Sequence, residues 1–205
     1  MVRAFVPPPL PPDPPVRLDA VQRLLEQANQ SLVEAKCSFG VGHEDKVSFN
    51  RRFRMKNGLS FTHPGRCHPD IVEPAGPIDP QVGVIGAWDA RGNLLGVVVN
   101  FACHATTSPG GISANWIYYL EKTIRGGMGA NVPVVFLQGA CGDVTQVDNL
   151  SPYPSPTGDQ YARLVGGRVG AEAVRVLLSA YAGSFGPVDA SNKILTFNRR
   201  IPSPE

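Results

Sequence analysis

The chain has 205 residues, 42% of them hydrophobic and 18% charged, and its formal net charge is +2. Acidic and basic residues are interspersed, which excludes a basic nucleic-acid groove and an acidic tail. No window of eighteen apolar residues occurs, so a membrane-spanning helix is not expected. The four cysteines contain no C-x-x-C pair and are too few for the disulfide framework of a small secreted protein.

Residues 1–16 (MVRAFVPPPLPPDPPV) are predicted to form an extended, mobile leader, because its prolines fix φ and remove backbone donors. A secretory signal needs an uninterrupted apolar run, whereas prolines interrupt this one after Val6. The expected location is therefore cytoplasmic by default, or secreted or periplasmic if the chain is a fragment of a longer precursor. An arm or linker is favoured over a ligand for an SH3-type groove.

The next segments are predicted to be a helix, a hairpin and a loop. Residues 17–36 have apolar side chains at three- and four-residue spacing, which is typical of an amphipathic helix lying on an apolar surface. Residues 37–53 are predicted to form a hairpin around a His-Glu-Asp turn, with apolar and polar residues alternating in its second half. Residues 55–80 are predicted to be loop because prolines and glycines punctuate them.

The clearest strand signal covers residues 81–104, where two apolar runs flank a turn at 89–93. The second run, 94–103, is apolar on both faces, which favours a strand inside a sheet that is covered on both sides. A helix is predicted over residues 114–125, ending at two glycines. Residues 132–138 (VPVVFLQ) are predicted to form another buried strand.

The last third of the chain is predicted to be a helix over 159–183 and a strand over 188–200. The glycines inside this helix are expected to permit close packing on the sheet. Alternating strands and helices predict an α/β layered fold with a mixed, largely buried β-sheet flanked by helices. Residues 17–205 are expected to form a single domain.

Polar residues follow two of the predicted strands. His104 and Thr106 come directly after the run 94–103, and the turn 139–143 (GACGD) follows the next strand. Ligands of open α/β sheets bind just beyond the strand ends. We therefore expect both segments to converge on one edge of the sheet, together with Arg51 at the end of the hairpin.

Histidines and cysteines suggest two kinds of zinc site. His104 is able to bind zinc through one ring nitrogen, but a catalytic zinc needs about three protein ligands. An H-x-x-x-C-H segment in the loop suggests a structural site instead. The candidate structural set is His63, Cys67 and His68 with Cys103 or Cys141.

Four stretches, in this order, resemble the neutral/alkaline non-lysosomal ceramidase family and its bacterial relatives. They are VSFNRRF (47–53), PDIVEPAGPIDPQVGVIGAWDARGNLLGVVVNFACHATT (69–107), ISANWIYYLE (112–121) and VVFLQGACGDVTQ (134–146). Together they cover most of residues 37–148, and the specificity of the match lies in the ordered set rather than in one motif.

The resemblance implies a zinc-dependent amidohydrolase, in which metal-activated water hydrolyses the amide of an N-acyl amide or lipid-like substrate. It matches His104 to a zinc-ligating histidine. It matches Arg51 to the arginine that holds the substrate carbonyl, where a fixed cation stabilises an oxyanion. The neighbouring Asn50 is the second candidate catalytic residue. The residues that it places around the substrate are Gly139, Cys141, Gly142, Asp143 and Thr106.

The chain also departs from the family. The second zinc histidine of the family lies upstream of the first helix, where this chain has prolines, and its carboxylate and tyrosine ligands lie beyond residue 205. We therefore expect one zinc ligand of four, weak zinc binding and little hydrolysis by the isolated chain. Such an incomplete domain is expected to expose an apolar face or an unpaired strand, above all near residues 188–197, and so to self-associate.

Two other functions stay open. The same fold would serve a non-catalytic module that binds or assembles. Alternatively, Cys141 would be the nucleophile of a thiol hydrolase with His104 as its base, although the sequence identifies no third group to orient the histidine. Zinc content separates the amidohydrolase from both alternatives, and inactivation by iodoacetamide identifies the thiol hydrolase.

Overall fold

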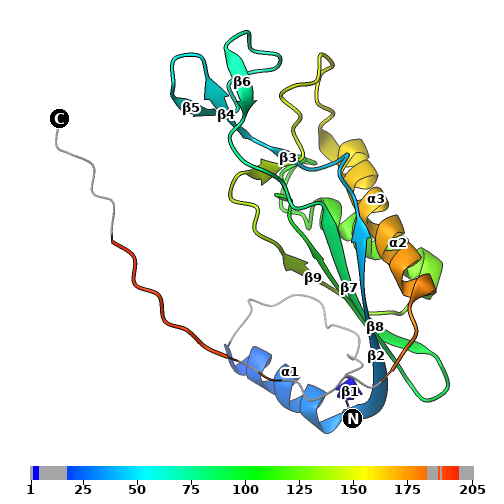
Figure 1. Ribbon diagram of the computed structural model, residues 1–205. Coiled ribbons are helices and arrows are strands. Elements are labelled where there is room, and N and C mark those ends of the chain that lie inside the picture. The colour runs from blue at the N-terminus through cyan, green and yellow to red at the C-terminus, as the bar shows by residue number, and fades with distance from the viewer. Residues whose placement is uncertain (1, 5–17, 184–188, 190, 199–205) are drawn as a thin grey trace.

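A computed structural model describes residues 2–4, 18–183, 189 and 191–198 (Figure 1). Its centre is a five-stranded sheet in the order β1-β2-β7-β8-β9. β8 and β9 run parallel, whereas the other neighbouring strands are antiparallel, so the sheet is mixed. The strands are β1 (Val2–Ala4), β2 (Val33–His43), β7 (Gln81–Trp88), β8 (Leu94–Phe101) and β9 (Val134–Gln138).

Two helices, α2 (Trp116–Met128) and α3 (Gly158–Ser179), lie side by side over one face of this sheet (Figure 1). The hydrophobic core lies between them and the inward side chains of β7 and β8, which alternate along each strand. Its fully buried members include Val82, Val84, Val99, Phe101, Trp116, Leu120, Ile124, Val165 and Val169. The mixed sheet packed against helices confirms the predicted α/β layered fold.

Glycines of α3 allow the two helices to approach closely. A Cβ on Gly166 would lie 2.0 Å from the backbone oxygen of Trp116, and a Cβ on Gly170 would lie 2.8 Å from Thr123 Cβ. A Cβ on Gly167 would meet nothing within 4 Å. Close packing at the glycines is therefore confirmed at two of the three positions, but the partner is α2 and not the sheet, so that part of the prediction is wrong.

The opposite face of the sheet is apolar and exposed. The prediction that the strand over 94–103 is covered on both sides is therefore wrong. An uncovered apolar face, expected above all near residues 188–197, is present on the central sheet. A shallow groove of about 210 Å³ lies on this open face. The large exposed side chains of the open face are Phe39 (60% exposed), Val41 (47%), Ile85 (42%), Val135 (52%) and Leu137 (51%).

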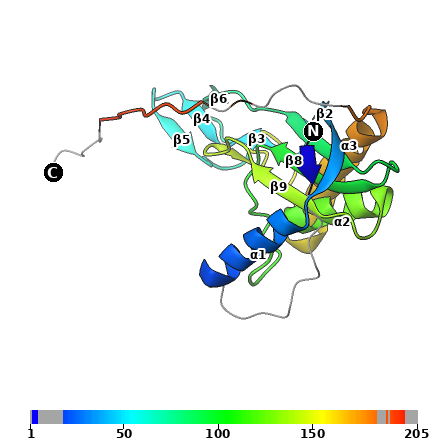
Figure 2. The same ribbon diagram turned by 90° about the horizontal axis from the view of Figure 1, so that it is seen from below.

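The first helix, α1 (Leu18–Gln30), is shorter than predicted, because residues 33–36 already belong to β2. It projects away from the sheet in both views (Figures 1 and 2), and its apolar residues Val21, Leu24 and Leu25 stay exposed rather than lying on an apolar surface. Residues 2–4 of the predicted leader form β1, which pairs with β2. The rest of the leader lies outside the described residues.

The predicted hairpin over 37–53 is wrong. β2 pairs with β7 instead, and residues 49–50 form a separate strand, β3 (Phe49–Asn50), that pairs with β10 (Val144–Thr145). The predicted loop also contains regular structure, since β5 (Ser60–Thr62) and β6 (Ile71–Pro74) flank β4 (Arg52–Met55) in a small antiparallel sheet. The pairings of β2 with β7 and of β3 with β10 join segments that are distant in the sequence, which local alternation does not reveal.

Other boundaries differ less. The predicted helix over 114–125 runs from Trp116 to Met128, and β9 is an exposed edge strand rather than a buried one. Residues 191–198 form no strand and their side chains are exposed, so the strand prediction is wrong for these residues, and most of its remainder lies outside the described part. None of the helices in the described part has the length and apolar character needed to cross a bilayer.

Candidate functional site

The ends of β8 and β9 bring the two predicted polar segments together. Because the two strands are parallel, the chain leaves both at the same edge of the sheet. The backbone N–H of Gly139 donates to Phe101 O at 3.0 Å, and the N–H of His104 donates to Val144 O at 3.1 Å. A Cβ on Gly139 would lie 3.0 Å from the backbone of Ala102, so this close crossing favours glycine.

The segment that contains Asn50 and Arg51 joins the same edge through β3 and β10. The N–H of Arg51 donates to Asp143 O at 2.7 Å, and its Nη2 donates to Gly142 O at 2.6 Å. The buried amide of Asn50 donates from Nδ2 to Asp143 Oδ2 at 2.9 Å and to Pro77 O at 3.3 Å. The turn 139–143 is thus held from one side by these two residues.

His104 faces Cys141 across the gap between the two strand ends. Its Nδ1 lies 3.1 Å from Cys141 Sγ, which is within hydrogen-bond distance for a thiol and an imidazole nitrogen. Burial raises the pKa of Cys141, the Arg51 charge lowers it, and Asp143 raises it further. The cysteine is therefore a protonated thiol at neutral pH.

The backbone of His104 is fixed by residues that the sequence analysis missed. Trp116 Nε1 donates to His104 O at 3.0 Å. Trp116 is the first residue of α2, and the side chain of Asn115 caps that helix by accepting from Trp116 N at 2.9 Å and from Thr107 Oγ1 at 2.8 Å. The predicted helix begins at residue 114, two residues before α2, so the sequence analysis places Asn115 inside the helix and not at its cap.

The predicted site residues converge, with one exception. Thr106 makes two hydrogen bonds to Gln146: its Oγ1 donates to Gln146 Oε1 at 3.1 Å, and its carbonyl accepts from Gln146 Nε2 at 2.7 Å. Its side chain therefore contacts Gln146 and not His104 or Cys141. The predicted convergence on one sheet edge is thus confirmed for the other residues, while their roles stay predictions. The residues that converge are Asn50, Arg51, His104, Gly139, Cys141, Gly142 and Asp143.

The structural zinc hypothesis is wrong. His63 Nδ1 bonds to Asn149 Oδ1 and Cys67 Sγ to Leu150 O, while His68 Nδ1 accepts from its own turn. Cys103 is buried in the core beside Val47 O. Within the described ranges no three His, Cys, Asp or Glu side chains are grouped so that they could hold a metal ion.

At the strand ends, imidazole nitrogen and thiolate sulfur are both ligands that zinc prefers. The His104 and Cys141 side chains therefore fit two positions of a zinc site. The described part of the chain does not assemble the three protein ligands of a catalytic zinc.

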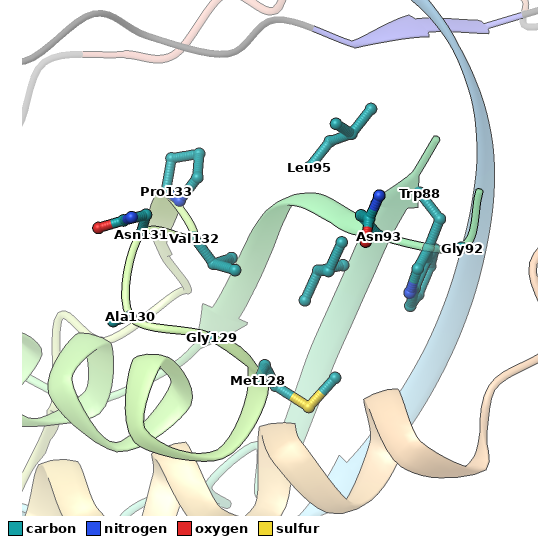
Figure 3. A pocket seen from close by; sticks show the side chains of 11 residues that line it. Trp88, Gly92, Asn93, Leu95, Met128, Gly129, Ala130, Asn131, Val132 and Pro133 are labelled. Atoms are coloured by element: carbon teal, nitrogen blue, oxygen red, sulfur yellow. The ribbon is translucent and has the colours of Figure 1, made fainter. Parts of the chain in front are cut away.

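A large cavity lies at the other end of β8 (Figure 3). It has a volume of about 570 Å³ and is formed by the β7–β8 turn and the α2–β9 loop, with Trp88, Leu94, Met128 and Pro133 among its lining residues. None of its lining residues is titratable. The chemistry-bearing residues therefore lie at the opposite end of the strand from this cavity.

No family model matches the chain. It is 27% identical over 203 residues to the neutral ceramidase of Pseudomonas aeruginosa, a match covering 92% of this chain and 28% of the relative. The crystal structure of that enzyme superposes with a TM-score of 0.58 at 24% identity, covering 81% of this chain and 26% of the other. A structure described as ceramidase complexed with C2 gives a TM-score of 0.59 at 24% identity.

These matches confirm the resemblance to the neutral ceramidase family in sequence and in fold. The chain spans little more than a quarter of the length of the relatives that it matches.

Proposed function

We propose that the chain carries part of the site of a ceramidase-like amidohydrolase, which hydrolyses an N-acyl amide or lipid-like substrate. The observation that carries this proposal is the contact of Arg51, His104 and the turn 139–143 at one sheet edge. These residues lie within segments that match a neutral ceramidase over most of the chain.

Arg51 is assigned to the substrate carbonyl. Its guanidinium has five N–H donors in a planar fork, and the bond from Nη2 to Gly142 O sets its orientation. The donors on the rest of the fork suit the carbonyl oxygen, which gains negative charge as the amide is attacked. A cation that is already in place stabilises that charge without reorganisation.

Asn50 acts as a positioning residue rather than as a catalytic one. Its amide is buried and is used by Asp143 and Pro77, so it holds the turn against β3. The turn 139–143 is held by the backbone hydrogen bonds of Gly139 and Asp143, and the carbonyl of Gly142 in this turn accepts from the Arg51 guanidinium. The backbone of His104 is held at the same edge by hydrogen bonds to Val144 O and from Trp116 Nε1.

A zinc ion, when bound, supplies a Lewis acid that polarises the carbonyl and lowers the pKa of a bound water. His104 is the residue that the family resemblance assigns to that ion. Since the described part of the chain brings together fewer than three ligands, we propose weak zinc binding and low turnover for the isolated chain.

The test measures hydrolysis of a fluorogenic N-acyl amine with added zinc, for the parent chain, His104→Ala and Arg51→Ala. Arg52→Ala is the matched control, because Arg52 is exposed and adjacent to Arg51. We expect low turnover that is lost in the first two variants and kept in the control. Absence of turnover from the parent chain would favour the non-catalytic module.

A thiol hydrolase is the second candidate, and the distance of 3.1 Å between Cys141 Sγ and His104 Nδ1 favours it. The raised pKa of Cys141 opposes it, because little thiolate forms at neutral pH. Turnover without zinc that iodoacetamide abolishes in the parent chain, and that is absent from Cys141→Ala, would support this candidate over the metal-dependent one.

A further inference from the structure

The Cys141 thiol lies within hydrogen-bond distance of the Nδ1 atom of His104. The turn 139–143 leaves β9 directly opposite the residue that follows β8, so the two side chains meet although 37 positions separate them in the sequence. The thiol lies 3.1 Å from Nδ1 and is half-buried. It therefore occupies the space in which a ligand or ion on this ring nitrogen would have to sit.

From this geometry we propose that His104 and Cys141 together bind a borderline or soft divalent ion such as Zn²⁺ or Co²⁺, with Cys141 as a thiolate ligand. This inference rests on the metal assignment of His104 in the proposed function and adds a sulfur ligand to it. Sulfur and imidazole ligands select such ions over Mg²⁺ and Ca²⁺, which prefer oxygen.

The observed separation is compatible with shared coordination. In a tetrahedral site with Zn–N of about 2.0–2.1 Å and Zn–S of about 2.3 Å, the two ligand atoms lie roughly 3.5 Å apart. The pair is observed at 3.1 Å, so a small opening of the turn accommodates an ion between the two atoms. A Cβ on the next residue, Gly142, would meet nothing within 4 Å, so no side chain packs against the turn at that position.

Charges around the pair act in both directions. The guanidinium of Arg51 lies near enough to influence the thiol and repels a cation, whereas the Asp143 carboxylate attracts one. The bond from Arg51 to Gly142 O holds the guanidinium on the backbone of the turn. With two protein ligands the site binds the ion weakly, and its other positions are taken by water or substrate donors.

The other cysteines provide controls. Cys103 is fully buried with its Sγ near Val47 O, and Cys67 is exposed with its Sγ bonded to Leu150 O. Neither thiol has a histidine ring nitrogen among its hydrogen-bond partners. A thiolate–metal signal that arises from Cys141 must therefore survive the replacement of Cys67.

The experiment is a titration of the full chain with Co²⁺ under reducing conditions, followed by absorption. A thiolate ligand gives a near-ultraviolet charge-transfer band that imidazole and carboxylate ligands do not give. We expect a saturable band in the parent chain and in Cys67→Ser, and loss of the band in Cys141→Ser and His104→Ala. Circular dichroism on each variant establishes that it is folded, and Cys141→Ser keeps a small polar side chain at the position.

A parent chain without the band, or a band that persists in Cys141→Ser and disappears in Cys67→Ser or Cys103→Ser, overturns the inference. The outcome is separable from that of the proposed function. A band without amide hydrolysis supports the thiolate ligand and contradicts the hydrolase, whereas hydrolysis that depends on His104 without a band does the reverse.

Discussion

Asn50 and Asp143 lie 93 positions apart in the sequence, and Asn50 Nδ2 donates to Asp143 Oδ2 at 2.9 Å in a partly buried contact. This bond ties the β3 segment to the turn that follows β9. A Cβ on Gly76 would lie 3.3 Å from the same amide, so a third segment packs against the pair. The arrangement of the candidate site therefore depends on one side-chain amide as much as on the sheet.

Replacement of this amide by a carboxyl should destabilise the protein. In Asn50→Asp the donor to Asp143 is lost and two carboxylates face each other, which we expect to cost about 2–3 kcal/mol of unfolding free energy at neutral pH. The cost should shrink at acidic pH, because one shared proton restores the hydrogen bond. Urea unfolding at both pH values measures it.

Asn57→Asp is the matched control for this substitution. Asn57 is exposed and its Oδ1 accepts from the N–H of Leu59, a role that an aspartate fills equally well. We expect less than about 0.5 kcal/mol for it. Equal destabilisation by the two substitutions would mean that the contact between Asn50 and Asp143 contributes nothing specific.

The sequence predicted the candidate site better than the fold around it. His104 and the turn 139–143 were placed correctly because each directly follows an apolar strand, and strand ends meet at sheet edges. The support from Trp116 was not predicted, because its bond to His104 O depends on how α2 is placed against β8. Local patterns carry little information about such tertiary placement.

The pairing of the strands is the part of the fold that the sequence predicts least well. Local alternation predicts that β2 pairs with the segment that follows it, whereas its partner is β7, some forty residues further on. Residues Gly40 and Gly42 of β2 leave room for Val176 and Glu172 of α3, a packing relation that has no local signature. The sequence also predicts a buried strand where the structure has the exposed edge strand β9, because an apolar run does not reveal whether its strand lies at the edge of a sheet.

Substitutions at two neighbouring glycines of α3 should have opposite effects. Gly166→Ala places a Cβ 2.0 Å from Trp116 O, a backbone atom that cannot move aside, so we expect a loss of about 1–3 kcal/mol of unfolding free energy. Gly167→Ala has open space and should gain about 0.5–1 kcal/mol from helix propensity. Thermal unfolding of both variants provides the comparison, and a stabilised Gly166→Ala would contradict the close approach of the helices.

The open face of the sheet should mediate self-association. Its exposed apolar side chains are removed from water when a second sheet stacks on them, at the usual spacing of about 10 Å. Val41→Asp puts a charge in the middle of this face and should convert dimers or larger species to monomers in sedimentation velocity. Leu178→Asp, at a 72% exposed position on α3, should leave the distribution unchanged. A parent chain that sediments as a monomer at high concentration would rule this surface out.

Buried acidic groups near the site should make the fold sensitive to alkali. Burial, with a smaller effect of Cys141, raises the pKa of Cys103 from 9.0 to about 12, and burial likewise raises the pKa of Tyr161 from 10.0 to about 12. Since each folded-state pKa lies above the unfolded value, the unfolded chain loses its protons first as the pH rises. The resulting stabilisation of the folded state is complete below the unfolded pKa and is lost as the pH rises toward the folded one, by up to about 1.4 kcal/mol per pH unit for each group.

Tyr161→Phe separates the contribution of the tyrosine from that of Cys103. The variant loses the hydrogen bond to Gln146 O, so its stability at neutral pH should fall by about 1 kcal/mol. Its unfolding free energy should then decline less steeply than that of the parent chain above about pH 10, because one titrating group is gone. Tyr153→Phe, at an exposed position, should reproduce the parent slope. Urea unfolding between about pH 8 and about pH 11 measures all three slopes. Identical slopes for the parent chain and Tyr161→Phe would show that the phenol ionises equally in the folded and unfolded states, contrary to its burial against the Gln146 backbone.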